Sequence, residues 1–199
     1  MDISCIVLAG GKGLRLGRKK TLETINNATL LQTVVSQLAF LNSDTIIVTA
    51  NEESFPRLTG SKLRVVTDIY PGKGPLAAIY TGLKISDSFY NLVVACDMPF
   101  LNRDLLRYMV QVAPDYDIVV PRVGDMVEPL HAIYSKECLV PIETLIKQDS
   151  LSVNRLFALV RTRYVETEEI DRFDPQHLSF FNINTQDDLR KARKLAGET

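Results

Sequence analysis

The apolar run from Ile3 to Ala9 stops abruptly at two glycines, and this change most constrains what the chain can fold into. A continuous apolar run bounded by turn residues predicts a strand buried on both faces. Apolar side chains then recur at spacings of three and four between residues 29 and 41, which predicts an amphipathic helix. A buried strand followed by a helix is typical of a parallel sheet, because parallel strands need crossover connections.

The same alternation continues along the chain. Strands are predicted at residues 45–50, 63–67, 92–95, 118–120, 131–134 and 163–165, and helices at 75–85, 105–112, 136–146 and 153–159. A last helix is expected between Thr185, which has an acid three residues later as in a capping box, and Gly197. This order predicts an α/β fold, doubly wound and Rossmann-like, in which a mostly parallel sheet lies between two helical layers.

Composition limits the function classes. The 199 residues suit a single domain, 1–199, and 46% hydrophobic residues suffice for a full core. With 23 Lys+Arg against 24 Asp+Glu, the net charge of −1 gives no general attraction to nucleic acid or to an anionic membrane. We therefore expect a small-molecule ligand.

The cysteines and the N-terminus bear on location. Cys5, Cys96 and Cys138 are odd in number and lie in apolar stretches, which favours reduced core cysteines. The first residues lack the basic start of a signal peptide, and no apolar run has the length of a membrane helix. We expect a cytoplasmic protein.

The segment after the first strand has the character of a phosphate loop. Residues 10–20 contain four glycines and place five cations within nine residues. Glycines let backbone N–H groups approach an anion, and the cations add charge. The dinucleotide fingerprint fails because Leu16 occupies its third glycine position, and no Gly-Lys pair precedes Ser or Thr as in a Walker loop.

Two acids follow later strands. Asp68 precedes a second glycine loop, residues 70–76, and Asp97 follows the strand at residues 92–95. Asn102 is better placed than Asp97 to cap the next helix, so the Asp97 carboxylate is our candidate ligand for magnesium. In an open α/β sheet, ligands bind beyond the carboxyl ends of the strands, where both acids are expected.

Six separated motifs together resemble the molybdenum cofactor guanylyltransferase (MobA) family. They are Leu8-Ala9-Gly10-Gly11 with Arg15, Gly17 and Lys20; Asp68; residues 71–77; residues 97–101; residues 129–134; and residues 181–185. The resemblance extends from residue 3 to about residue 190 and implies a sheet of the nucleotide-diphospho-sugar transferase type. It implies a nucleotidyltransferase that moves GMP from GTP to molybdenum-loaded molybdopterin, using Mg²⁺ and releasing pyrophosphate. It also implies transient contact with the molybdoenzymes that accept the cofactor, or with their chaperones.

The resemblance also implies roles for particular residues. The nucleotide would be held by Leu8, Ala9, Gly10 and Gly11, and its triphosphate would be bound by Arg15 and Lys20. The guanosine would be contacted by Asn51 and Asp68, and the magnesium ion would be bound by Asp97. The molybdopterin would lie beside Asn182 and Asn184. Arg15, Lys20 and Asp97 would be the catalytic residues. Cytidylyltransferase relatives usually carry Ala in place of Gly10, which favours guanine here. Gly13 and Leu16 depart from the family's usual Ser and Met, and Lys19 competes with Lys20 as the phosphate ligand.

Other interpretations stay open. The closest is a cytidylyltransferase for molybdopterin or a sugar-phosphate enzyme of the same fold. A nucleotide-binding regulatory module is the non-enzyme alternative, and an NAD dehydrogenase is a distant third. His131, inside an apolar stretch, is expected to be a hydrogen-bonded structural histidine or a substrate contact rather than an acid or base. His177 is expected on a surface loop, and Tyr70, Tyr80 and Tyr134 in the core rather than stacked on a ligand.

Overall fold

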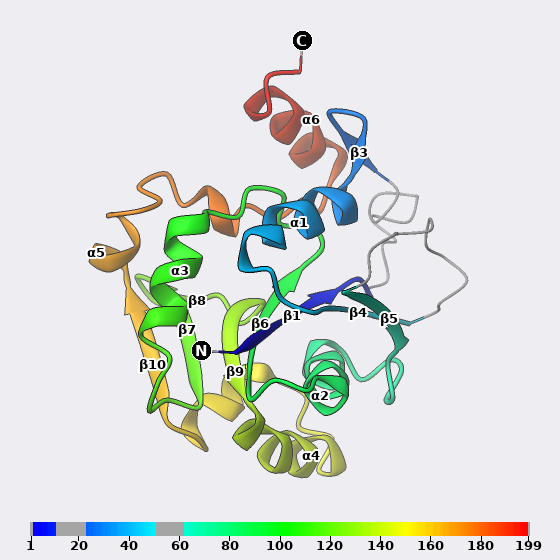
Figure 1. The fold of residues 1–199 in the computed structure, drawn as a ribbon, viewed down its shortest axis with the longest axis vertical. Helices are drawn as coiled ribbons and strands as arrows, with labels where there is room; N and C mark the ends of the chain where they lie inside the picture. The colour runs from blue at the N-terminus through cyan, green and yellow to red at the C-terminus, as the bar shows by residue number, and fades with distance from the viewer. Residues whose placement is uncertain (1, 11–22, 51–61, 199) are drawn as a thin grey trace.

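A computed structural model describes residues 2–10, 23–50 and 62–198. Within these residues the main sheet has eight strands in the order β10-β7-β9-β6-β1-β4-β5, with β8 paired to β7 (Figure 1). The strands are β1 (Ile3–Leu8), β4 (Thr45–Thr49), β5 (Leu63–Thr67), β6 (Tyr90–Ala95), β7 (Ile118–Val123), β8 (Met126–Val127), β9 (His131–Ser135) and β10 (Thr162–Glu166).

The sheet is mostly parallel, as predicted. β1 pairs in parallel with β4 on one side and β6 on the other, β4 with β5, and β7 with β10. β9 is the exception, since it runs antiparallel between β6 and β7. The chain moves outward from β1 to β5 and then returns to the opposite side of β1 at β6. This reversal creates the crevice in which ligands of such sheets bind.

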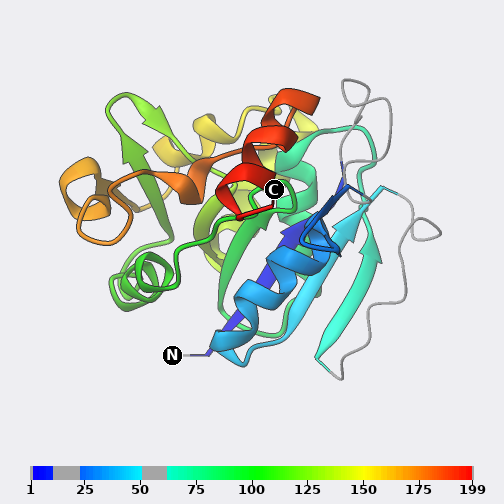
Figure 2. The same cartoon turned by 90° about the horizontal axis from the view of Figure 1, so that it is seen from above.

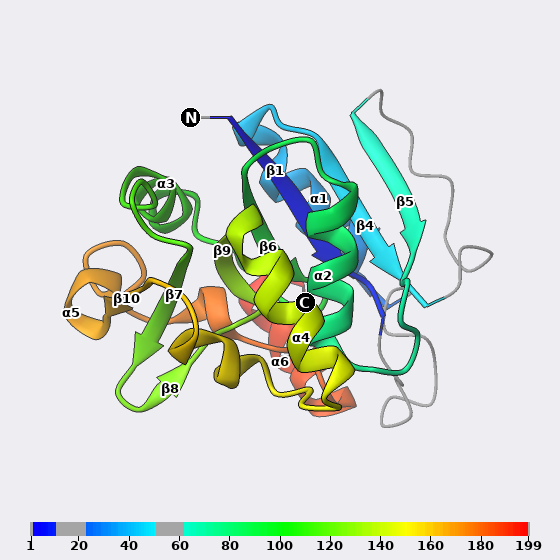
Figure 3. The ribbon, with the colours of Figure 1, turned by 90° about the horizontal axis from the view of Figure 1, so that it is seen from below.

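Helices cover both faces of the sheet. α1 (Leu30–Leu38) and α3 (Arg103–Gln111) pack on one face, and α2 (Pro75–Ile85) and α4 (Leu139–Lys147) pack on the other. Figures 1 and 3 show the two pairs on opposite sides of the strands. All six residues of β1 are buried, which confirms a strand covered on both faces. The three-layer α/β/α prediction is therefore confirmed.

A smaller unit lies beyond the carboxyl edge of the sheet. The hairpin of β2 (Thr24–Ile25) and β3 (Ala28–Thr29) turns at Asn26 and Asn27, which both have positive φ. Its Ile25 packs with Ile183 and with Leu189 of α6 (Gln186–Leu195) in a separate apolar cluster. Figure 2 shows α6 on the side toward which the strand arrows point. The C-terminal part of the chain therefore returns to the edge where the strands end.

The local predictions differ from the structure mainly in the second half. The segment predicted as a helix at 153–159 is a 3₁₀ helix over Val153–Ala158, and the helix predicted from residue 136 begins as a 3₁₀ turn over Lys136–Cys138. The helix predicted for residues 29–41 ends at Leu38, and its last three residues, Ala39–Leu41, form a 3₁₀ turn. The shorter elements β2, β3, β8, α5 (Thr167–Ile170) and the 3₁₀ turn Leu178–Phe180 were not predicted. Elements of two to four residues are too short to show a hydrophobic period. The cap predicted at Thr185 is present as a full capping box.

The remaining general predictions concern cysteines and helices. Cys5, Cys96 and Cys138 are buried and form no disulfide within the described residues, and burial raises the pKa of Cys5 and of Cys138 to about 12. These thiols are therefore core residues rather than reactive groups. In the ranges that the structure describes, each helix is too short or too polar to cross a membrane.

Candidate functional site

Backbone hydrogen bonds connect the ends of four neighbouring strands. The Ala9 N–H donates to the Val48 carbonyl (2.8 Å), and the Cys96 N–H donates to the Leu8 carbonyl (3.1 Å). The Asp68 N–H donates to the Thr49 carbonyl (2.8 Å) in the same way. The residues that leave β1, β5 and β6 are therefore held along one edge, beside the reversal of strand order. Sequence-predicted residues Leu8, Ala9, Gly10, Asp68 and Asp97 all lie on this edge, whereas Gly11, Arg15, Lys20 and Asn51 lie outside the described residues.

Asp68 has a fixed carboxylate. Its Oδ1 lies 2.9 Å from the hydroxyl of Thr81 in α2 and accepts the Tyr70 N–H at 3.1 Å. The same Thr81 oxygen accepts the Ile69 N–H at 3.0 Å, so the turn after β5 is tied to the middle of α2. Gly74, with φ +79°, then begins α2 directly before Pro75. This conformation explains why the second glycine loop needs its glycine.

Asp97 lies in the turn after β6 and does not cap a helix. As predicted, Asn102 caps α3, and its side chain accepts the N–H groups of Asp104 and Leu105 at 3.0 Å each. On the other side of the loop, Gln37 of α1 donates to the Pro99 carbonyl (2.7 Å) and accepts the Leu101 N–H (3.1 Å). Residues 99–102, which follow Asp97 directly, are thus held in place by α1 and by the start of α3.

The C-terminal segment 173–184, which we call the acceptor-side segment, lies against this loop. Its Ile183 N–H donates to the Asp97 carbonyl (3.0 Å), and its Ser179 hydroxyl accepts the Asn102 N–H (3.0 Å). Asn182 and Asn184 flank Ile183, so the structure brings both predicted asparagines next to Asp97. The Asn182 amide also donates to the Phe180 carbonyl (3.1 Å).

His131 differs from its prediction. It is fully buried at the start of β9, and neither ring nitrogen has a hydrogen-bond partner within the described ranges. The expectation of a hydrogen-bonded structural histidine is therefore wrong. Burial lowers the pKa of His131 to about 4, although the nearby Asp174 carboxylate opposes this shift. The imidazole is neutral near pH 7, and it packs edge-on against Phe180.

This low pKa predicts a loss of stability in acid. The unfolded chain protonates His131 near pH 6.5 while the folded chain does so near pH 4, so stability falls as the pH drops through that window. The loss from this residue should reach about 2 kcal/mol at pH 5. Urea unfolding at pH 7 and pH 5 should show a smaller pH effect in His131→Leu than in the wild type. Equal pH effects in the two proteins would contradict the assignment.

His177 and the three tyrosines agree with expectation. His177 lies in a turn with its Nε2 2.7 Å from an Asp171 oxygen. Tyr134 and Tyr80 are buried, and Tyr70 packs against Tyr80 with ring centroids 5.7 Å apart. These aromatic rings therefore belong to the core.

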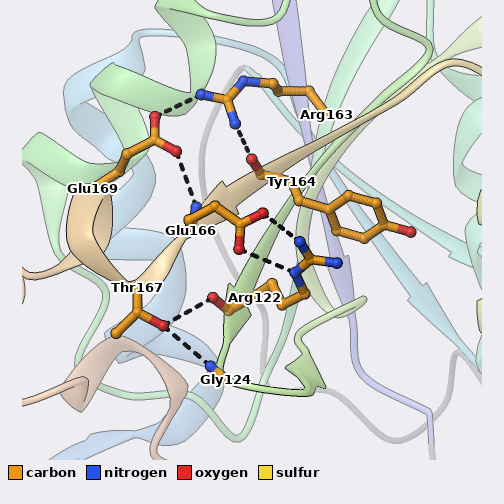
Figure 4. Close-up of polar contacts among 7 residues, drawn as sticks. All are labelled: Arg122, Gly124, Arg163, Tyr164, Glu166, Thr167 and Glu169. Atoms are coloured by element: carbon orange, nitrogen blue, oxygen red, sulfur yellow. Dashed lines mark hydrogen bonds and ion pairs between the residues drawn. The ribbon is translucent and has the colours of Figure 1, made fainter.

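A charged network at the end of β7 was missed from the sequence. Arg122 forms a two-point ion pair with Glu166 of β10 (3.0 and 2.5 Å), and its guanidinium lies 4.4 Å from the centroid of the Tyr164 ring. Figure 4 shows this pair beside a second one, Arg163 with Glu169. β6 and β7 both run antiparallel to β9 and are therefore parallel to each other, so Arg122, near the end of β7, stands at the same edge of the sheet as Asp97. The only sequence signal was an arginine at a strand end, since the pairing of β7 with β10 is long-range.

The donor set suits a metal ion only in part. Among the described residues no group of three or more His, Cys, Asp or Glu side chains is arranged to hold a metal. Magnesium commonly takes only one or two protein carboxylates and completes its shell with water and substrate phosphates. A single carboxylate at Asp97, beside a loop suited to phosphates, fits that pattern.

Fold and edge together define a class. An open, mostly parallel sheet with a glycine turn at its strand-order reversal and acids on the neighbouring strand ends is a nucleotide-binding α/β domain. Residues 5–166 match the model of the MobA-like NTP transferase domain. The chain belongs to this family and is a nucleotidyltransferase.

Individual relatives agree with this assignment. The chain is 38% identical to the probable molybdenum cofactor guanylyltransferase of Pelotomaculum thermopropionicum, over 96% of this chain and 92% of the relative. It is 37% identical to the molybdenum cofactor guanylyltransferase of Syntrophotalea carbinolica, over 96% and 90% of the two chains. The crystal structure of molybdopterin-guanine dinucleotide biosynthesis protein A from Archaeoglobus fulgidus superposes with a TM-score of 0.83 at 26% identity, covering 98% of this chain and 100% of that one.

Proposed function

We propose that this chain is a molybdenum cofactor guanylyltransferase, which transfers GMP from GTP to molybdopterin carrying molybdenum. The relatives similar over nearly their whole length carry this activity in their names. The observation that carries the proposal within the molecule is the hydrogen bond from Ile183 to Asp97. It joins the strand-end edge to the segment of Asn182 and Asn184, which supports adjacent sites for a donor and an acceptor.

The reaction needs little proton chemistry. A terminal phosphate oxygen of the acceptor attacks the α-phosphorus of GTP, the new P–O bond forms, and the bond to the β-phosphate oxygen breaks to release pyrophosphate. The acceptor phosphate is already ionised near neutral pH, so no strong base is required. Catalysis then consists of holding two anions in line and offsetting their charge.

Particular residues have roles in this proposal. The backbone of Leu8–Gly11 holds the nucleotide, Asn51 and Asp68 bind the guanosine, Arg15 and Lys20 bind the triphosphate, and Asn182 and Asn184 bind the molybdopterin. Asp97 would hold Mg²⁺, which when bound supplies positive charge to the phosphate oxygens. A cytoplasmic location and a transient handover of the product to a molybdoenzyme or its chaperone belong to the same proposal.

Pyrophosphate release tests the proposal. Purified protein is mixed with Mg²⁺ and each of GTP, CTP, ATP and UTP, with and without molybdenum-loaded molybdopterin. We expect release from GTP alone and only with the pterin. Release from CTP would instead support a cytidylyltransferase, and GTP binding without release would contradict the proposed reaction.

Gly10 offers a sharper test of base preference. A Cβ at this position would lie 3.6 Å from the Ala50 nitrogen, an ordinary contact, so the fold accepts alanine here. Gly10→Ala should therefore change stability by less than about 0.5 kcal/mol. If the glycine selects guanine, the ratio of GTP to CTP turnover should fall at least several-fold in this variant. An unchanged ratio with normal stability would remove Gly10 as a determinant of the base.

A further inference from the structure

His131 lies directly behind the acceptor-side segment. It is the first residue of β9 and stands opposite Val94, one residue before the end of β6. Its ring meets the Phe180 ring edge-on, with centroids 5.1 Å apart and planes at 83°. Edge-to-face aromatic pairs of this kind are favourable and have a preferred geometry. The sheet therefore fixes one ring, and that ring limits where the other can lie.

Phe180 in turn determines the position of the residues after it. Its carbonyl accepts the Asn182 side-chain amide (3.1 Å), and Ile183 follows with its bond to the Asp97 carbonyl (3.0 Å). A displaced Phe180 would move the Asn182 amide and loosen the Ile183 bond together. The link from His131 to Asp97 therefore runs through a short, continuous set of contacts.

The surroundings of His131 exclude a direct chemical role. The side chain is fully buried, so a bound substrate cannot reach it without rearrangement of the segment. Neither ring nitrogen is hydrogen bonded within the described part of the chain, and an unpaired buried N–H costs about 1–3 kcal/mol. An apolar side chain would fill the same space without this cost. Packing alone therefore does not explain why a histidine ring, in edge contact with Phe180, occupies the position.

We propose that His131 is a positioning residue for the acceptor, because its buried ring holds Phe180 and thereby aligns the Asn182 amide with Asp97. The inference rests on the proposed function, in which Asn182 and Asn184 bind the molybdopterin. It adds a residue that touches neither substrate. It also assigns a use to a histidine that the reaction itself does not need.

The test compares three variants by steady-state kinetics. His131→Ala removes the ring, His131→Phe keeps a ring without nitrogens, and Ile133→Ala is the control. Ile133 is a buried residue two positions further along the same strand and on the same face of the sheet, so its truncation removes core packing but keeps the ring that contacts Phe180. We expect His131→Ala to raise the KM for molybdenum-loaded molybdopterin by about 10-fold to 100-fold, with the KM for GTP within about two-fold of wild type.

The other two variants distinguish a role of His131 in positioning the acceptor from a role in stabilising the fold alone. His131→Phe should restore most of the acceptor KM, and Ile133→Ala should lower the melting temperature without moving either KM. Equal changes in both KM values, or none in His131→Ala, would overturn the proposal. So would an acceptor KM that rises equally in Ile133→Ala.

A second measurement separates this proposal from the proposed function. Amide hydrogen exchange needs no substrate, and it should speed up at residues 180–184 in His131→Ala but not in Ile133→Ala. If wild-type protein releases no pyrophosphate with the pterin while this exchange pattern appears, the proposed function fails and the link from His131 to Asp97 stands. Unchanged exchange at residues 180–184 would refute the link itself.

Discussion

Replacing Asp97 with alanine is expected to reduce GTP-dependent pyrophosphate release by about 10²–10³-fold. The carboxylate is the candidate ligand for the cation that offsets charge on the reacting phosphates, and removing one such electrostatic group commonly costs 10²–10³-fold. The half-buried side chain stands at a turn, and the bond that secures the neighbouring segment uses the Asp97 backbone carbonyl. The substitution leaves that carbonyl in place, so the fold should persist.

Asp97→Asn is the matched control for this prediction. The amide keeps the shape of the side chain but loses its charge, so activity should fall nearly as far as in the alanine variant. The free energy of unfolding of each variant, measured by thermal unfolding, should differ from that of the wild type by less than about 1 kcal/mol. Turnover that survives in Asp97→Ala with its magnesium dependence intact would show that another residue holds the cation.

The sequence predicts the sheet well because its signals are local. Buried parallel strands appear as uninterrupted apolar runs, and the helix Pro75–Ile85 was predicted with the bounds it has in the structure. The antiparallel direction of β9 was not foreseen, since a buried strand has the same apolar character in either direction. Strand order depends on tertiary packing, which no short window of sequence contains.

In the candidate site, the residues at strand ends were predicted from the sequence, whereas the long-range contacts were not. Leu8 ends a strand and Asp68 and Asp97 follow strands, and the rule for open α/β sheets is sufficient to place all three on one edge. The contact between Ile183 and Asp97 joins residues 86 positions apart and has no spacing that would reveal it. The pairing of Arg122 with Glu166 was missed for the same reason. The hydrogen bonding of His131 was misjudged because burial can be inferred from its neighbours, whereas the lack of a partner among the described residues cannot.

α2 packs closely against β1, whose last residue lies at the edge of the sheet that carries the candidate site. Gly82 of α2 faces Ile6 of β1, and a Cβ on Gly82 would lie 2.5 Å from Ile6 Cγ2 and 2.8 Å from its Cδ1. Real Cβ atoms essentially never come so close, so with any side chain here either the Ile6 side chain or the helix must shift. β1 ends at Leu8, directly before the residues proposed to bind the nucleotide. A disturbance of this packing therefore bears on the site as well as on the core.

Gly82→Val should accordingly destabilise the protein by about 3 kcal/mol, the upper part of the range for overpacked cores. For a chain of this length the melting temperature should fall by roughly 6–12 °C. Ile6→Ala removes the atoms in conflict and by itself costs about 2–5 kcal/mol through the cavity it leaves. In a denaturant double-mutant cycle, the double variant should lose about 2 kcal/mol less free energy of unfolding than the two single variants lose in sum. Simple additivity would mean that α2 can move away from β1 at little cost, and the close approach at Gly82 would then not be a requirement of the fold.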